Sequence, residues 1–348
     1  MNLTLAAIDY LDRTRALFDG SVAPEGIALR CLRFTPYELF QRVAQKVEFD
    51  IAEMSVSTYL SLLSRGDRRY IALPVFLSRH FRHGFVFVHG EADIRQPRDL
   101  VGKRVGVPEY EMTAALWQRA FLEHDHGVSP RDIQWLQGGE FAPGFVERQK
   151  LPTPPGVSIG FIPEDRTLHD MLAAGDIDAL CSPFRPKALT DGSGRVRRLF
   201  PDFVSVEKEY FARTGFFPIM HLTVVRRDLY EREPWIAASL LRAFVRAQEL
   251  GWKRLQELGA LAVMLPWLTR DLEEIDATVG RAGWTYGFAE NRAILDAMCA
   301  YSHEQGLSAR RLSPEEVFAP ETHDLRVSDL ALSGPGVAGA PPAPAAAS

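Results

Sequence analysis

The segment from Gly102 to Ala114 constrains the fold of this chain most strongly. It predicts a short buried strand over residues 105–107 that ends at Pro108, followed by a turn and a helix beginning near Thr113. A strand end that leads into a helix start gathers free backbone N–H groups and the positive end of a helix dipole at one place. The segment therefore predicts an α/β fold with a binding site for a carboxylate or a phosphate.

Strands and helices alternate along most of the chain, which favours open α/β sheets. We expect a first lobe over residues 1–98 and a second lobe over residues 99–215, with a return to the first lobe over residues 216–328. Thr35 to Glu38 reads as a capping-box start of a helix in the first lobe. Residues 329–348 are rich in Pro, Ala and Gly, and this composition predicts a disordered tail.

Composition and charge exclude several classes of protein. The 348 residues carry a formal net charge of -5, whereas general nucleic-acid affinity would need a basic excess. No apolar run reaches the roughly 18 residues of a membrane helix, so no membrane partner is expected. The three cysteines are far apart, which argues against a disulfide framework or a zinc knuckle. The first residues open as a strand without a basic leader, from which we expect a cytoplasmic location.

Several segments together resemble one family, the 4,5-dihydroxyphthalate decarboxylases, which are cytoplasmic relatives of type II periplasmic binding proteins. The segments that carry the resemblance are residues 49–59, 74–83, 102–114, 214–221, 265–267 and 284–287. The resemblance covers roughly residues 3–322. It implies a two-lobed type II periplasmic-binding-protein-like fold with two interlobe crossovers and a ligand held between the lobes. It also implies a role in phthalate degradation, as part of aromatic catabolism.

The reaction that this resemblance implies is the non-oxidative decarboxylation of 4,5-dihydroxyphthalate to protocatechuate. Each carboxylate of this substrate lies para to a phenol hydroxyl, so the ring itself can accept the electrons. The site then needs a general acid near the ring carbon, a proton acceptor near the phenol and a cationic clamp for the carboxylate that stays. No cofactor is strictly required. A divalent metal stays open, although the nearest ligand group, His124 to His126, reads as a helix terminus.

The segment from Ser78 to His83 offers suitable groups at a strand end, where ligands bind in open α/β sheets. Arg79 and Arg82 are predicted to bind carboxylates, in the bidentate geometry that arginine favours. His80 and His83 are predicted to move protons near neutral pH. The alternative interpretation of this segment is a solvated basic turn.

Two further residues are candidates for proton transfer. His221 lies late in an apolar strand, where a histidine is more often a satisfied core residue, but its expected place at the second crossover favours a role in the cleft. Glu109 is predicted to be a general acid whose pKa rises when the lobes close. The alternative for Glu109 is a helix-flanking acid that only complements the dipole.

The remaining candidates are polar residues at expected helix starts and strand ends. Tyr110 and Thr113 are expected to close over the substrate from the second lobe, with Thr113 also a candidate N-cap. Ser55 and Ser57 open a helix of the first lobe in the same manner. Arg13, after the first strand, is a weaker candidate partner of a carboxylate.

Two other functions stay open. The first is a non-catalytic substrate-binding protein of an ABC-type transporter for a small carboxylate. The second is a synthase that uses the same fold for another small acid. Under each of these hypotheses the expected ligand is a small acid, and for a decarboxylase it is an aromatic carboxylate. The sequence leaves the formation of a homo-oligomer open.

Overall fold

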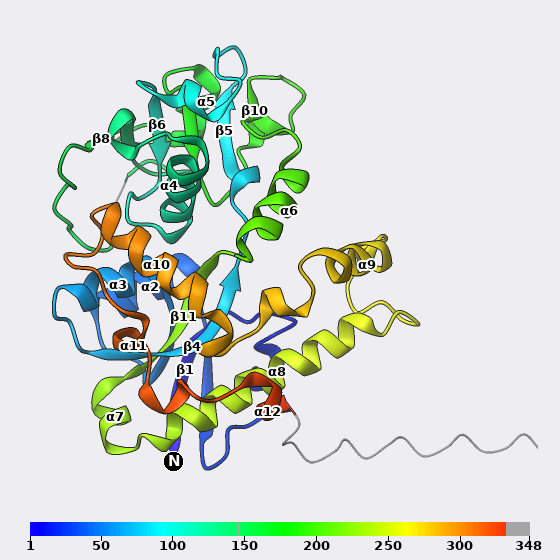
Figure 1. Ribbon diagram of the computed structural model, residues 1–348. Helices are drawn as coiled ribbons and strands as arrows, with labels where there is room; N and C mark the ends of the chain where they lie inside the picture. Colours follow the sequence, from blue (N-terminus) through cyan, green and yellow to red (C-terminus); the bar gives the residue numbers. More distant parts are fainter. Residues whose placement is uncertain (145–146, 332–348) are drawn as a thin grey trace, which may run out of the picture.

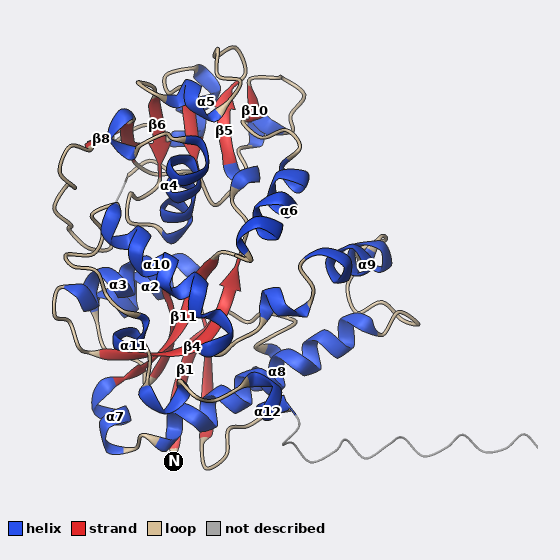
Figure 2. Cartoon of the chain, in the orientation of Figure 1, coloured by secondary structure: helices blue, strands red, loops and turns tan. Residues whose placement is uncertain are grey.

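The computed structural model describes residues 1–144 and 147–331, which form two α/β lobes, one above the other in Figure 1. The first lobe holds a five-stranded sheet in the order β2 (Ala28–Arg33), β1 (Asn2–Ala7), β3 (Ile51–Ser55), β11 (Ile219–Arg226) and β4 (Tyr70–Arg79). The second holds a six-stranded sheet in the order β10 (Val196–Arg198), β5 (Val86–His89), β9 (Ala179–Cys181), β6 (Arg104–Val107), β7 (Gln134–Gln137) and β8 (Ser158–Phe161). Figure 2 shows both sheets with helices packed around them.

Strand direction decides which sheet edges face each other. Strands β1, β2 and β3 are parallel, whereas β11 runs antiparallel to both β3 and β4. In the second sheet β6, β7, β8 and β9 are parallel. Strand β5 runs antiparallel to both of its neighbours, β9 and β10, so β10 again has the direction of β9. The loops after parallel strands therefore gather at one edge of each sheet, where open α/β sheets place ligands.

The chain passes between the lobes twice. The first passage leads from β4 to β5, and the second leads from β10 through α6 (Phe203–Thr214) to β11. Strand β5 pairs with β9 and β10, so Val86–His89 belongs to the second sheet. The predicted first lobe ended at residue 98 and so included β5, whereas the strand pairing places β5 in the second sheet. The residues of β5 alone do not indicate which sheet the strand joins.

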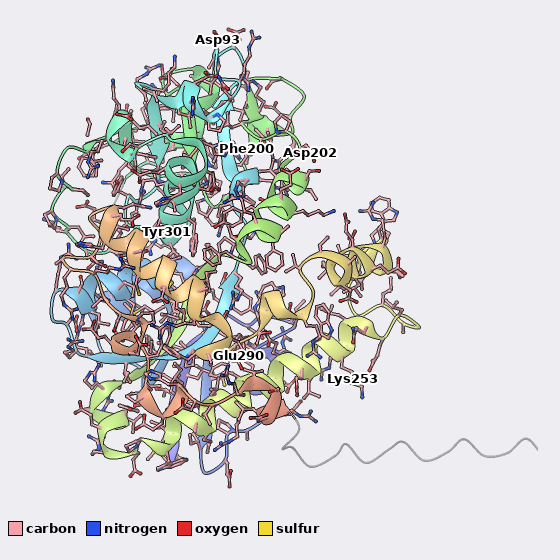
Figure 3. The ribbon with its side chains drawn as sticks, viewed as in Figure 1. Asp93, Phe200, Asp202, Lys253, Glu290 and Tyr301 are labelled. Atoms are coloured by element: carbon pink, nitrogen blue, oxygen red, sulfur yellow. The ribbon has the colours of Figure 1, made fainter. Side chains whose placement is uncertain are left out.

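Helices cover both sheets (Figure 2). The remaining helices are α1 (Arg15–Phe18), α2 (Pro36–Gln45), α3 (Val56–Ser64), α4 (Thr113–His126), α5 (Leu168–Ala174), α7 (Arg227–Arg232), α8 (Trp235–Gln256), α9 (Leu268–Thr278), α10 (Arg292–Glu304), α11 (Pro314–Val317) and α12 (Val327–Ala331). Helix α10 of the first lobe packs against α4 of the second through Tyr301, whose ring centroid lies 5.7 Å from that of Trp117 (Figure 3). The expected capping box at Thr35 does not form, although Pro36 does begin α2.

The C-terminal part of the chain has two further features. Helix α9 projects from the first lobe (Figure 1). The segment between α8 and α9 exposes Met264 and Trp267. The expected disordered tail falls mainly on residues 332–348, which lie outside the described residues, while 329–331 belong to α12. Within residues 1–144 and 147–331, no helix has the length and apolarity needed to cross a membrane.

Candidate active site

Three polar side chains share one face of the first sheet at its interlobe edge. Successive side chains of a strand alternate between faces, so Glu53 and Ser55 of β3 point to the same side. His221 of β11 lies directly opposite Ser55 in the antiparallel register. Cross-strand partners lie on the same face, and this places His221 beside both β3 residues.

Glu53 is the centre of a hydrogen-bonded group. Its side chain has no exposed surface, and its Oε1 lies 2.7 Å from His221 Nδ1. The same oxygen accepts the Tyr10 hydroxyl proton at 2.8 Å, while Oε2 accepts from the backbone N–H of Ile8 at 3.0 Å. An ionised carboxylate only accepts hydrogen bonds, so the pairing assigns a proton to His221 Nδ1 and leaves Nε2 for chemistry.

Tyr10 stays protonated in this group. Burial and the neighbouring Glu53 carboxylate hold the pKa of the Tyr10 hydroxyl well above its ordinary value. Arg13 lies over the Tyr10 ring, with its guanidinium carbon 3.9 Å from the ring centroid. The guanidinium also donates from Nε to the Leu77 carbonyl at 2.6 Å and pairs with Asp12. Arg13 is therefore part of the wall behind Tyr10 and is already engaged by protein partners.

Hydroxyl groups of the two lobes meet directly beside this group. Thr113 Oγ1 lies 2.9 Å from Ser55 Oγ and 3.0 Å from Ser57 Oγ, and it accepts from the Ser57 backbone N–H at 3.1 Å. Ser55 is the N-cap residue of α3 and Thr113 is the first residue of α4. Two helix N-termini, each with the partial positive charge that attracts anions, therefore face each other across the lobes.

The side chains of Thr113 and Ser55 do not cap their helices, although the sequence made both residues candidates for that role. The N-cap residue of α4 is Met112, and neither Met112 nor Ser55 makes a side-chain capping hydrogen bond. The Thr113 and Ser55 hydroxyls are used between the lobes. The structure thus brings Ser55, Ser57 and Thr113 together with His221. All four are candidate site residues from the sequence.

A second contact path leads from His221 to Glu109. The Phe40 ring meets the His221 ring edge-on at a centroid distance of 4.5 Å, and the Arg148 guanidinium carbon lies 5.9 Å from the Phe40 centroid. Arg148 Nη2 pairs with Glu109 Oε2 at 2.6 Å, and the Arg148 backbone N–H donates to Glu109 Oε1 at 2.9 Å. Burial raises the pKa of Glu109, while the Arg148 guanidinium opposes that shift.

Arg79 lies inside the first lobe. It is buried, and its guanidinium donates to the carbonyls of Phe217 and Thr285 at 3.1 and 3.0 Å and to Asn291 Oδ1. Nη1 and Nη2 are thus engaged by protein acceptors inside the first lobe, while Nε is buried without a hydrogen-bond partner among the described residues. The sequence predicted that Arg79 and Arg82 bind substrate carboxylates together from one loop. The structure differs from this prediction for Arg79, because Ser78 and Arg79 continue β4 where a loop was expected.

The two histidines of this segment are also separated from His221. His83 is buried in the second lobe, stacked on Phe121 at a centroid distance of 4.1 Å with Phe200 and Tyr210 alongside. Burial lowers the pKa of His83 to about 3, so it is neutral near pH 7. His80 is exposed at the end of β4, and its Nδ1 contacts the Phe81 carbonyl. A crossover distributes its side chains over two lobes, which explains why the cluster does not converge.

Tyr110 faces the interior of the second lobe. Its ring lies 3.7 Å from the Arg119 guanidinium carbon, and its backbone N–H donates to Gln137 Oε1. A pocket of about 370 Å³ runs along this side of the second lobe, with Glu109, Tyr110 and Glu111 in its wall. Tyr110 thus contributes to this neighbouring pocket rather than to the hydroxyl contact at Thr113.

Sequence reasoning missed Glu53, Tyr10 and Arg148. A signal for Glu53 was present, because a carboxylate in the otherwise apolar strand Ile51–Ser55 must find partners when it is buried. Arg148 lies in a loop that carries no periodic pattern. No group of three or more His, Cys, Asp or Glu side chains among the described residues is arranged to hold a metal ion.

Two lobes joined by two crossovers, with helix N-termini facing each other, define the periplasmic-binding-protein-like class. Similar solved structures include a putative periplasmic sulfonate-binding protein of Methylobacillus flagellatus, with a TM-score of 0.56, 14% identity and coverage of 95% of this chain and 93% of that chain. Another is the aliphatic sulphonate-binding protein of Escherichia coli, with a TM-score of 0.53, 14% identity and coverage of 92% and 98%. The expected fold class is confirmed.

The sequence comparison then gives the family. A 4,5-dihydroxyphthalate decarboxylase of Comamonas testosteroni is 40% identical over 320 residues, which are 92% of this chain and 97% of the relative. One of Pseudomonas putida is 40% identical over 216 residues, which are 62% of this chain and 83% of the relative. No family model matches the sequence. The chain belongs to the 4,5-dihydroxyphthalate decarboxylase family, which confirms the resemblance.

Proposed function

We propose that this protein is a carboxy-lyase that converts 4,5-dihydroxyphthalate to protocatechuate and carbon dioxide, a step of phthalate degradation. Family membership supports the reaction, and the Glu53–His221 pair at 2.7 Å beside the interlobe hydroxyls is the observation that carries it. A histidine held by a buried carboxylate is a recurrent proton-transfer device.

His221 is proposed as the general acid. When protonated, its imidazolium is stabilised by Glu53 through Nδ1–H, and Nε2–H delivers the proton to the ring carbon that bears the leaving carboxylate. The carbon–carbon bond then breaks, its electron pair returns to the ring, and carbon dioxide leaves. The proton on His221 is replaced from solvent in each cycle.

The facing N-termini of α3 and α4 are proposed to bind substrate carboxylates. The hydroxyls of Ser55, Ser57 and Thr113 and the Ser57 N–H supply neutral donors at a place of positive helix potential. In the described conformation these groups satisfy one another, so substrate would enter as the lobes separate and would be enclosed as they close. The Arg148–Glu109 pair lies alongside and is proposed to close over the substrate from the second lobe.

The experiment is incubation of metal-stripped protein with 4,5-dihydroxyphthalate, followed by chromatography for protocatechuate. We expect product from the wild type and a loss of at least about 100-fold from His221→Asn. His124→Asn, an exposed histidine at the end of α4, is the matched control and should keep wild-type turnover. Unchanged substrate that still raises the melting temperature would favour the transporter-type binding protein. A repeat with added divalent ions would test metal dependence.

The cytoplasmic location expected from the sequence remains a prediction. Its test is cell fractionation of the native host with antibodies against this protein. Activity in the cytosolic fraction would support it, whereas activity in a periplasmic extract would contradict it.

A further inference from the structure

A second buried polar cluster lies in the other lobe, at the strand ends that face the interlobe side. Glu140 follows β7 by three residues and Ser182 follows β9 directly. Ser182 Oγ donates to Glu140 Oε1 and accepts from the Phe184 N–H at 2.9 Å. His169, in the first turn of α5, places its Nε2 3.9 Å from Glu140 Oε1. None of these residues takes part in the proton delivery assigned to His221.

The cluster is incompletely satisfied by its protein partners. The side chains of Glu140 and His169 are each 10% exposed, and His169 Nε2 has no hydrogen-bond partner among the described residues. Arg82 is 8% exposed, and among the described residues it forms no salt bridge, although the Glu207 and Glu140 carboxylates act on its charge from a greater distance. Its recorded contacts are long ones, to Met220 Sδ at 3.4 Å and to the Pro183 carbonyl at 3.5 Å. Buried polar groups are normally paired, so this deficit points to a ligand.

An aromatic pair borders the cluster on its exposed side. Phe141 and Phe184 are 58% and 50% exposed, with ring centroids 5.3 Å apart. The Phe141 ring also meets the His169 ring edge-on at 4.5 Å. Two exposed rings beside buried polar groups form a surface on which the face of a planar aromatic ligand can pack.

The cluster lies on the same edge of the second sheet as Thr113. Strands β6 and β9 are parallel neighbours, α4 with Thr113 at its start follows β6, and Ser182 follows β9 directly. Thr113 in turn contacts Ser55, the cross-strand partner of His221. A ligand whose ring carbon reaches His221 can therefore extend its opposite end toward Arg82 and Glu140. In 4,5-dihydroxyphthalate that opposite end carries the hydroxyl groups.

We propose that Glu140, Ser182 and Arg82 form the subsite for the two ring hydroxyls, and that Glu140 accepts the proton of the hydroxyl para to the leaving carboxylate. This inference rests on the proposed decarboxylation. It gives Arg82 a phenolate as its partner, in place of the carboxylate predicted from the sequence. Burial raises the pKa of Glu140 to about 7, which suits a group that must both take and return a proton.

The step balances as follows. His221 adds a proton to the ring carbon as the hydroxyl O–H bond breaks and its proton passes to Glu140, giving a ring ketone beside Arg82. The bond to the carboxylate then breaks, and its electron pair restores the aromatic ring and returns charge to the oxygen. Glu140 gives the proton back to that oxygen. The net change is the uptake of one proton and the release of carbon dioxide.

The test is ligand selectivity in binding, measured by titration calorimetry with two compounds that the proposed reaction does not consume. Protocatechuate carries both hydroxyls, whereas phthalate carries only carboxylates. We expect Glu140→Gln and Ser182→Ala each to raise the Kd of protocatechuate at least about 10-fold and to change that of phthalate less than about twofold. A site built to hydrogen-bond a ligand hydroxyl depends on those partners.

Glu91→Gln is the control, because Glu91 is an exposed carboxyl of the second lobe outside the cluster. It should leave both Kd values near those of the wild type. Equal losses for both ligands in Glu140→Gln and Ser182→Ala, or no loss for either, would overturn the subsite. The binding result does not depend on turnover. Selective loss in a protein that never forms protocatechuate would uphold the subsite and refute the decarboxylase.

Discussion

His221 Nδ1 lies 2.7 Å from Glu53 Oε1, and the Glu53 side chain has no exposed surface. A buried carboxylate is costly unless it is well paired, and here Tyr10 and the Ile8 backbone N–H complete its partners. The arrangement fixes the ring of His221 at the edge of β11 that faces the second lobe. In the proposed mechanism Glu53 therefore acts through His221, as a positioning residue.

Glu53→Gln should reduce kcat by at least about 100-fold, because an amide no longer stabilises the imidazolium of His221 or enforces its tautomer. The fold should persist at reduced stability, since the single amide oxygen of glutamine can replace only one of the two Glu53 oxygens that accept from Tyr10 and from the Ile8 N–H. Steady-state kinetics over a pH series, with thermal melting of the same samples, measures both. The exposed Glu231→Gln on α7 is the control. Wild-type kcat with an unaltered pH profile in Glu53→Gln would refute the positioning role.

Thr113→Val should raise KM by about 10-fold. The substitution removes the oxygen that meets Ser55 and Ser57 and leaves the Ser57 N–H without its acceptor, at a cost of about 1–3 kcal/mol. Thr223→Val is the matched control, because the Thr223 hydroxyl is buried and has no partner among the described residues. Its replacement should leave KM unchanged and preserve stability. Equal KM values in the two variants would contradict the interlobe role of Thr113.

The sequence predicted the fold well because its strand and helix patterns are local. Pro36 at the first position of α2 and the strand from Arg104 to Val107 before α4 both follow from neighbouring residues. The anion-facing helix starts at Ser55 and Thr113 follow in the same way. The position of β5 could not be predicted, because its partners β9 and β10 lie about 90 to 110 residues further along the chain.

The candidate site was predictable only in part, for the same physical reason. Arg79, His80, Arg82 and His83 are close in sequence, but they lie on a crossover whose side chains divide between two lobes. The group that does converge joins Tyr10, Glu53 and His221, which come from three separate strands or strand ends. Only the sheet register brings these residues together, and register is not visible in local periodicity.

His83→Phe should keep turnover and should stabilise the protein in acid. Burial lowers the pKa of His83 to about 3, whereas the unfolded chain has a value near 6.5. Between these values only the unfolded state gains the proton, so stability from the neutral ring is complete above about pH 6.5 and falls as pH decreases. At pH 5 the wild type has lost about 2 kcal/mol through this residue.

Urea unfolding of wild type and His83→Phe at pH 7.5 and pH 5 measures this effect. The difference in unfolding free energy between the two proteins should shift in favour of the variant at pH 5 by about 2 kcal/mol. An identical difference at both pH values would show that His83 is not held neutral. Loss of turnover in a variant that melts normally would restore His83 as a proton donor.

Arg79→Met should unfold the first lobe more readily without weakening substrate binding. The substitution removes the donor to the Phe217 and Thr285 carbonyls and to Asn291, which tie β4, β11 and the segment before α10 together. Each buried acceptor that is left without a donor costs about 1–3 kcal/mol. We therefore expect a lower melting temperature with an unchanged KM in the folded fraction, and no effect from the exposed Arg281→Met. The opposite pattern, a raised KM at normal stability, would return Arg79 to the role of substrate clamp that the sequence predicted.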